Sequence, residues 1–173
     1  KPLTLKSIPE SYKNFDVILG DPYYINQFKP MKFFKKGFKI ILENPSLLFK
    51  KEKRNIKFHF DLMHGNKNLE KAIELLDDNN KKDFTDYVNS QVYFNPHNMF
   101  ICKSKKLLKE YYSNLFPWLK KCESLFGFKE LRGFGKIRIY TFLAERFMPY
   151  WFQKNAKVKT MPIIFYDIRK NFN

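Results

Sequence analysis

Runs of apolar residues predict several short strands. Residues 14–20 are rich in β-forming side chains and close on Gly-Asp-Pro, which is typical of a buried strand followed by a turn. Residues 91–94 and 99–102 also read as extended segments. A terminal strand is predicted over residues 158–165, and Pro162 favours a sheet edge for it because proline cannot donate to the ladder.

Helical spacing of apolar residues marks three longer segments. Residues 66–77 begin with Asn66 as the expected N-cap, and residues 104–126 begin with Ser104 in the same role. Residues 137–154 form the third segment. Proline is expected to kink or split the second helix at position 117 and the third at position 149. The apolar stripe of the second helix comprises Leu108, Tyr112, Leu115, Leu119, Cys122 and Phe126, and that of the third comprises Phe142, Leu143, Phe147, Tyr150 and Trp151.

The remaining segments read as connections. Residues 23–42 are basic and aromatic without a clean period, so they are expected to be irregular or partly helical. Residues 78–82 predict a polar break, with a helical turn or two over 83–89, and residues 127–136 predict a basic loop. Strands separated by helices indicate an α/β fold, and no linker divides the chain, so a single domain over residues 1–173 is expected.

Composition excludes several classes of protein. The hydrophobic content of 44% and the aromatic content of 18% exclude a disordered tail, and two cysteines exclude a disulfide scaffold. Charged residues interrupt every apolar run before the roughly 18 residues that a membrane span needs. The 33 Lys and Arg against 17 Asp and Glu give a net charge of +16. This charge favours a polyanionic partner: nucleic acid, an anionic membrane surface or a nucleotide sugar.

The pattern of histidine and cysteine residues does not indicate a metal site. The histidines are His59, His64 and His97, and the cysteines are Cys102 and Cys122, and no pair has the spacing of zinc ligands. Ordinary structural or surface roles are the expectation for the histidines, and buried reduced thiols for the cysteines.

A glycine-rich basic segment is a candidate phosphate-binding loop. Gly133 and Gly135 flank Phe134 immediately before a predicted helix, and Arg132, Lys136 and Arg138 surround them. Backbone amides and cations of this kind can bind a diphosphate. The spacing matches neither of the common phosphate-binding fingerprints, so a plain turn before a helix remains the alternative.

Among the acidic residues, Glu145 is the strongest candidate for a functional carboxylate. It stands within Phe-Leu-Ala-Glu-Arg-Phe at 142–147, so partial burial and a requirement for a partner are expected. Either a neighbouring arginine holds Glu145 structurally, or its carboxylate faces a cleft as a general base. The residues alone leave both readings open.

Several motifs in the second half occur in a recognisable order. Residues 93–101 contain Asn-Met-Phe-Ile, and Leu-Phe-Pro-Trp-Leu at 115–119 and the 142–147 motif follow. The series closes with Met-Pro-Ile-Ile at 161–164. In this order the chain resembles a bacterial glycosyltransferase family from capsular and lipopolysaccharide O-antigen gene clusters, catalogued as domain of unknown function 4422. The resemblance is strongest over residues 93–165.

The resemblance implies a fold and an activity. The fold would be GT-A-like, a Rossmann-related mixed sheet with flanking helices, of which this chain would be the C-terminal portion. The activity would be hexosyl transfer from a nucleotide sugar, a UDP-sugar of galactose type among the candidates, to a capsular or O-antigen glycan, often lipid-linked. The family's front half is not in this chain, and residues 21–54 fit its pattern poorly. Whether the fragment is active alone therefore stays open.

The resemblance also implies roles for individual residues. Glu145 would be the catalytic base, and Arg146 would orient it or meet the diphosphate. His97 and Asn98 would hydrogen-bond sugar hydroxyls, and Arg138 would stabilise the leaving diphosphate. Any divalent cation, Mn²⁺ or Mg²⁺, would be held by residues outside this chain. Core positions are expected for Met99, Phe100, Trp118 and Trp151.

Two rival functions remain. Basic residues interleaved with aromatics over 29–39 are typical of nucleic-acid binding, although no recognition motif accompanies them, which disfavours a nucleic-acid-binding module. A non-catalytic interaction domain of a polysaccharide-assembly protein is the second rival. The same 29–39 stretch suggests a cytoplasmic location with peripheral attachment to the anionic inner face of the bacterial inner membrane, or an ordinary solvated basic face.

Overall fold

A computed structural model describes residues 10–27, 31, 38–129 and 131–164. These residues form a helix-rich α/β fold, which confirms the predicted fold class at that level. The strands are β1 (Val17–Gly20), β2 (Tyr23–Tyr24), β3 (Tyr93–Phe94), β4 (Phe100–Cys102) and β5 (Val158–Met161). The α-helices are α2 (Phe38–Glu43), α3 (Ile56–His64), α4 (Asn68–Ile73), α5 (Asp78–Ser90), α6 (Lys105–Phe126), α7 (Phe134–Ile137) and α8 (Ile139–Asn155), with short 3-10 helices at Glu10–Tyr12, Pro45–Leu48 and Lys51–Lys53.

The larger sheet is mixed and has the strand order β4-β1-β5. Strand β1 runs antiparallel to β4, with Val17 opposite Cys102, and parallel to β5, with Val17 opposite Val158. All four residues of β1 are buried, which explains its continuous apolar sequence because a central strand is covered on both faces. The predicted edge position of β5 is confirmed, and the strand ends just before Pro162. A separate pair joins β2 to β3.

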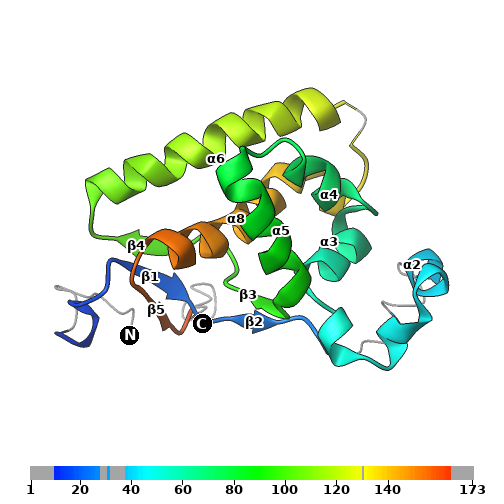
Figure 1. The fold of residues 1–173 in the computed structure, drawn as a ribbon, viewed down its shortest axis with the longest axis horizontal. Helices are drawn as coiled ribbons and strands as arrows, with labels where there is room; N and C mark the ends of the chain where they lie inside the picture. The colour runs from blue at the N-terminus through cyan, green and yellow to red at the C-terminus, as the bar shows by residue number, and fades with distance from the viewer. Residues whose placement is uncertain (1–9, 28–30, 32–37, 130, 165–173) are drawn as a thin grey trace, which may run out of the picture.

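Helix α8 is the central element of the helical layer. It packs against α6 and α5, and Figure 1 shows α6 running along one long side of the molecule with α8 beneath it. Ten residues of α8 are buried. The helix is therefore buried on more of its surface than the apolar stripe predicted from the sequence. Helices α6 and α8 both continue through their prolines, so the predicted splitting at those positions does not occur.

The region before α3 forms an arm that carries α2 to the end of the molecule opposite the sheet (Figure 1). Arg54 links separate segments of this arm. The residue is 4% exposed, and its guanidinium donates to the carbonyl oxygens of Asn26, Leu47 and Leu48. Most of the basic 29–39 stretch lies outside the described residues. No described helix combines the length and the apolar character needed to cross a membrane.

The structure corrects two sequence predictions about helices. Residues 78–82 are the first turns of α5 rather than a break, because the Asp77 carboxylate caps the helix by accepting from the amide of Asn80. In α6 the buried positions are Tyr111, Leu115, Trp118 and Cys122, whereas Tyr112 is 36% exposed. The buried face is set by partners distant in sequence: the Trp118 indole donates to the carbonyl of Ala72 at 2.7 Å.

Two further expectations concern single residues. Lys67, in a left-handed conformation, and not Asn66 is the N-cap of α4. Met99 is 45% exposed and is not a core residue, because it lies in the bend that precedes the edge strand β4. The core positions expected for Trp118 and Trp151 are confirmed.

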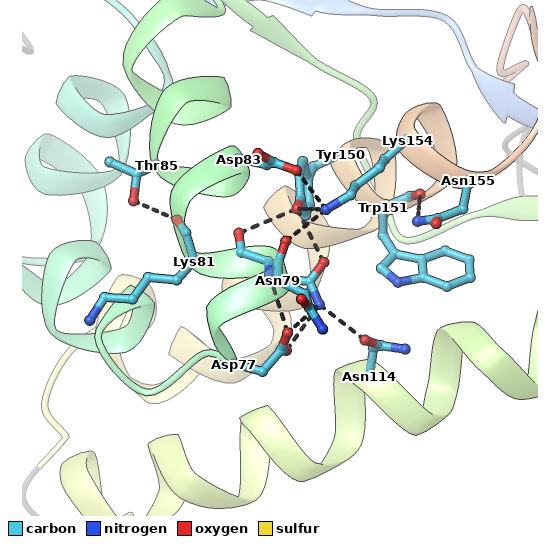
Figure 2. A network of polar contacts seen from close by, with 11 residues as sticks. Asp77, Asn79, Lys81, Asp83, Thr85, Asn114, Tyr150, Trp151, Lys154 and Asn155 are labelled. Carbon is cyan, nitrogen blue, oxygen red and sulfur yellow. Dashed lines mark hydrogen bonds and ion pairs between the residues drawn. The ribbon is translucent and has the colours of Figure 1, made fainter.

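A buried polar cluster joins three helices. Asn80, 5% exposed, donates through its amide nitrogen to Asp77 at 2.9 Å and to Asn114 of α6 at 3.0 Å. Its amide oxygen accepts from the Tyr150 hydroxyl of α8 at 3.1 Å. Figure 2 shows Asp77, Asn114 and Tyr150 converging at this point. Asn80 therefore fixes the start of α5 against both neighbouring helices.

Replacing Asn80 with alanine should lower the free energy of unfolding by about 2–3 kcal/mol, because Tyr150 and Asn114 would lose a buried partner. Asn79→Ala is the matched control: Asn79 is exposed, and the bond from Lys154 to it uses the backbone carbonyl, which the variant keeps. Urea unfolding followed by circular dichroism measures both. Equal stability of the two variants would contradict the structural role of Asn80.

Candidate functional site

A cleft of about 800 Å³ opens between the C-terminal end of α3, the loop into α7, and the first half of α8. The bend between β3 and β4 and the side chain of Tyr23 complete its walls. A volume of this size lies in the range of small-molecule binding sites. The residues that line it come from several separate parts of the chain and form the candidate site.

The centre of one wall is an ion pair between consecutive residues of α8. Glu145 and Arg146 are 9% and 1% exposed, and a carboxylate oxygen of Glu145 pairs with Nη1 of Arg146. The other carboxylate oxygen accepts from the backbone amide of His97 at 2.7 Å. Charge-assisted bonds on both oxygens fix the orientation of the carboxylate at the cleft wall.

Arg146 is enclosed by aromatic and imidazole groups. Its guanidinium carbon lies 3.5 Å from the ring centroid of Phe94, and Nη2 lies 3.4 Å from Nδ1 of His59. Its Nε is buried and has no hydrogen-bond partner among the described residues. Burial lowers the pKa of Arg146 and the charge of Glu145 raises it, and the guanidinium remains protonated at neutral pH. The charge of Glu145 is what makes burial of this cation tolerable.

The bend after β3 has an unusual backbone. His97 and Asn98 have φ values of 76° and 50°, in the left-handed region that non-glycine residues rarely adopt. Two bonds attach this bend to α8: the His97 amide to Glu145, and the Asn98 side-chain amide to the carbonyl of Thr141 at 3.0 Å. A strained backbone of this kind is kept only where surrounding contacts hold it in place, and it is frequent at functional sites.

A second wall is formed by the glycine loop, which packs against α3. A Cβ on Gly135 would lie 2.2 Å from the carbonyl oxygen of Met63, so only glycine allows this approach. His64 Nδ1 lies 3.1 Å from the carbonyl oxygen of Gly135, and its ring stacks on Phe142 at 4.0 Å. Gly133 has a φ of 80°, which also favours glycine. Packing and backbone conformation thus explain both glycines, and phosphate binding by this loop stays a prediction.

Most of the residues predicted for the site lie together. Seven of them line the cleft: His97, Arg132, Gly133, Gly135, Lys136, Glu145 and Arg146. Asn98 points instead into a second groove on the far side of the bend. Arg138 lies over the rings of Phe134 and Phe142, with centroid distances of 5.0 and 5.6 Å, and is not among the lining residues. Its role toward a diphosphate stays a prediction.

Three titratable lining residues of α3 were not predicted from the sequence as site residues: His59, Asp61 and His64. Asp61 is 5% exposed, and burial raises the pKa of its carboxyl group while Lys57 lowers it. The carboxylate accepts from Lys57 Nζ and from the Lys67 amide, both at 3.1 Å, and so fixes the corner between α3 and α4. A lone acid in an apolar helix with lysine four residues earlier was the available signal.

The described residues include no group of three His, Cys, Asp or Glu side chains arranged to hold a metal ion. The cleft itself offers the chemistry of its side chains. It presents one oriented carboxylate and one buried cation on the α8 wall, with two further cations, Arg132 and Lys136, on the loop wall.

Replacing Gly135 with alanine should displace α7 from α3 and lower the free energy of unfolding by about 1–3 kcal/mol, the usual range for overpacking. Phe134→Ala is the control in the same loop, because Phe134 is 70% exposed and should change stability by less than about 0.5 kcal/mol. Urea unfolding measures both variants. A Gly135→Ala variant as stable as its control would show that the loop does not rest on Met63.

Comparison with known proteins identifies a family and nothing closer. A family model described as a domain of unknown function, DUF4422, matches residues 21–156. Neither a curated protein nor a solved structure matches the chain. The match includes residues 21–54, so the expectation that this segment departs from the family pattern is wrong. The family inferred from the motifs is confirmed, and its description states no activity: the chain belongs to the DUF4422 family.

Proposed function

We propose that this chain is part of a glycosyltransferase that moves a sugar from a nucleotide donor, a UDP-sugar, to a capsular or O-antigen glycan. The observation that carries the proposal is the cleft, which is lined both by an oriented carboxylate, Glu145, and by the basic loop residues Arg132 and Lys136. The description of the family names no activity, so the proposal rests on the residues of the site.

Glu145 has the geometry of a general base. Each carboxylate oxygen can accept more than one hydrogen bond, so the bonds from His97 and Arg146 leave acceptor capacity for a substrate hydroxyl. In the proposed step the carboxylate takes the proton of the acceptor hydroxyl while that oxygen attacks the anomeric carbon. The bond from this carbon to the diphosphate oxygen breaks, and the nucleotide diphosphate leaves with the electron pair.

The loop wall suits the leaving group. Arg132 and Lys136 line the cleft and are exposed to solvent, so a diphosphate can reach them. Their charges would stabilise the negative charge that grows on the leaving oxygen. The aromatic rings of Tyr23, Phe134 and Phe142 line the same cleft and offer stacking surfaces for a nucleobase. A net charge of +16 would also raise the local concentration of an anionic donor.

The proposal also covers the type of fold and the location of the protein in the cell. The β4-β1-β5 sheet with its flanking helices is proposed to be the C-terminal portion of a GT-A-like domain. Attachment to the inner face of the bacterial membrane would bring the cleft to lipid-linked acceptors. No described contact favours the nucleic-acid-binding module or the non-catalytic interaction domain over the transferase.

Replacing Glu145 with glutamine should reduce the turnover number by about 10²–10⁴-fold, the usual contribution of a positioned general base, while the affinity for UDP stays within about twofold. Glu145→Asp should also lose turnover, because it keeps the charge but shortens the reach. Transfer from a panel of UDP-sugars and UDP binding by calorimetry measure the two effects.

Glu110→Gln is the control for this experiment, since Glu110 is exposed on α6. Circular dichroism melts establish that each variant is folded before its kinetics are compared. A folded Glu145→Gln variant with unchanged turnover would eliminate Glu145 as the base.

A further inference from the structure

A second groove, of about 320 Å³, lies between α6 and the first turns of α8 and is bounded by β4. Its walls are mainly aromatic, with an amide and a hydroxyl at one end, and no lysine or arginine lines it. The aromatic lining residues are Phe100, Tyr111, Tyr112, Phe116 and Tyr140, and the polar ones include Asn98 and Thr141.

A narrow ridge separates this groove from the main cleft. On α8, Phe142 and Glu145 line the cleft whereas Thr141 and Ala144 line the groove. In the bend after β3, His97 lines the cleft and the next residue, Asn98, lines the groove. The cleft and the groove thus lie on two sides of a ridge formed by α8 and the bend after β3. A chain-like ligand that crosses this ridge would occupy both depressions.

The groove offers exposed aromatic rings, and one of its lining residues carries an unsatisfied acceptor. The rings of Tyr112 and Phe116, one helical turn apart on α6, are parallel to within 9° at a centroid distance of 5.0 Å, and they are 36% and 58% exposed. The side-chain oxygen of Asn98, another residue of the groove lining, is buried and accepts no hydrogen bond from any described residue. A buried acceptor without a partner is unfavourable, so a ligand hydroxyl that reaches this oxygen would be stabilising.

The geometry points to a subsite for one sugar unit of the acceptor glycan, an inference that rests on the proposed transferase activity. A pyranose or furanose ring has C–H groups that pack on aromatic faces and hydroxyls that donate to an amide oxygen. A purely apolar chain would leave Asn98 unsatisfied, and a polyanion would find no cation in this groove. The subsite would hold the acceptor so that its terminal hydroxyl reaches Glu145 across the ridge.

The test uses the full chain with two probes: UDP for the cleft, and defined oligosaccharides of two to six sugars from bacterial capsular and O-antigen polymers for the groove. Saturation-transfer NMR and calorimetry measure oligosaccharide binding, and transfer assays give the Michaelis constant of the acceptor. The variants are Tyr112→Ala and Phe116→Ala, and Leu125→Ala is the control because Leu125 is exposed on α6 outside the groove.

The expected result is at least tenfold weaker oligosaccharide binding and a correspondingly higher Michaelis constant for the acceptor in Phe116→Ala. Turnover at saturating acceptor and UDP affinity should stay within twofold, and Leu125→Ala should match the parent chain. Since both aromatics are exposed, loss of folding is not expected, and thermal melts establish that the variants are folded.

Four other outcomes separate the two proposals. Oligosaccharide binding that depends on Phe116 without any sugar transfer would support the subsite and count against the transferase. Transfer that continues unchanged in both aromatic variants would overturn the subsite and leave the transferase standing. Absence of oligosaccharide binding would overturn the subsite, as would a groove that prefers a polyprenyl phosphate without sugars.

Discussion

The buried guanidinium of Arg146 is the constraint on which the rest of this site depends. A cation that is 1% exposed requires a counter-charge, and the adjacent Glu145 on the same helix supplies it. The ring of Phe94 covers the guanidinium at 3.5 Å, so β3 must lie directly against α8. The buried charge of Arg146 therefore determines how α8 packs against the β3–β4 segment.

The remaining walls of the cleft follow from this arrangement. Glu145 also holds the amide of His97, which stabilises the left-handed bend and sends Asn98 toward the second groove. Gly135 lets the basic loop approach the backbone of α3, because a Cβ at this position would clash with the carbonyl oxygen of Met63. The cleft and the groove thus share α8 and the bend as a common ridge, and that sharing suggests a single extended ligand.

The elements predicted correctly from the sequence are those whose structure depends on neighbouring residues. The apolar run at 17–20, the cap at Ser104 and the edge strand before Pro162 were all readable, because each depends on neighbouring residues. Contacts distant in sequence were not readable. The buried face of α6 is set by Trp118 bonding to Ala72, and a stripe centred on Tyr112 misses it. The need of Glu145 for a partner was predictable, whereas its bond to the His97 amide was not, because 48 residues separate the two.

The most direct test of this account is a double-mutant cycle on the ion pair, measured as free energies of unfolding of Glu145→Gln, Arg146→Met and the combined variant. Each single change should be strongly destabilising, Glu145→Gln by about 3–5 kcal/mol because it leaves a buried charge unpaired. The combined variant should be destabilised by at least about 1 kcal/mol less than the sum of the two. Additivity within about 0.5 kcal/mol would contradict the claim that this pair organises the site.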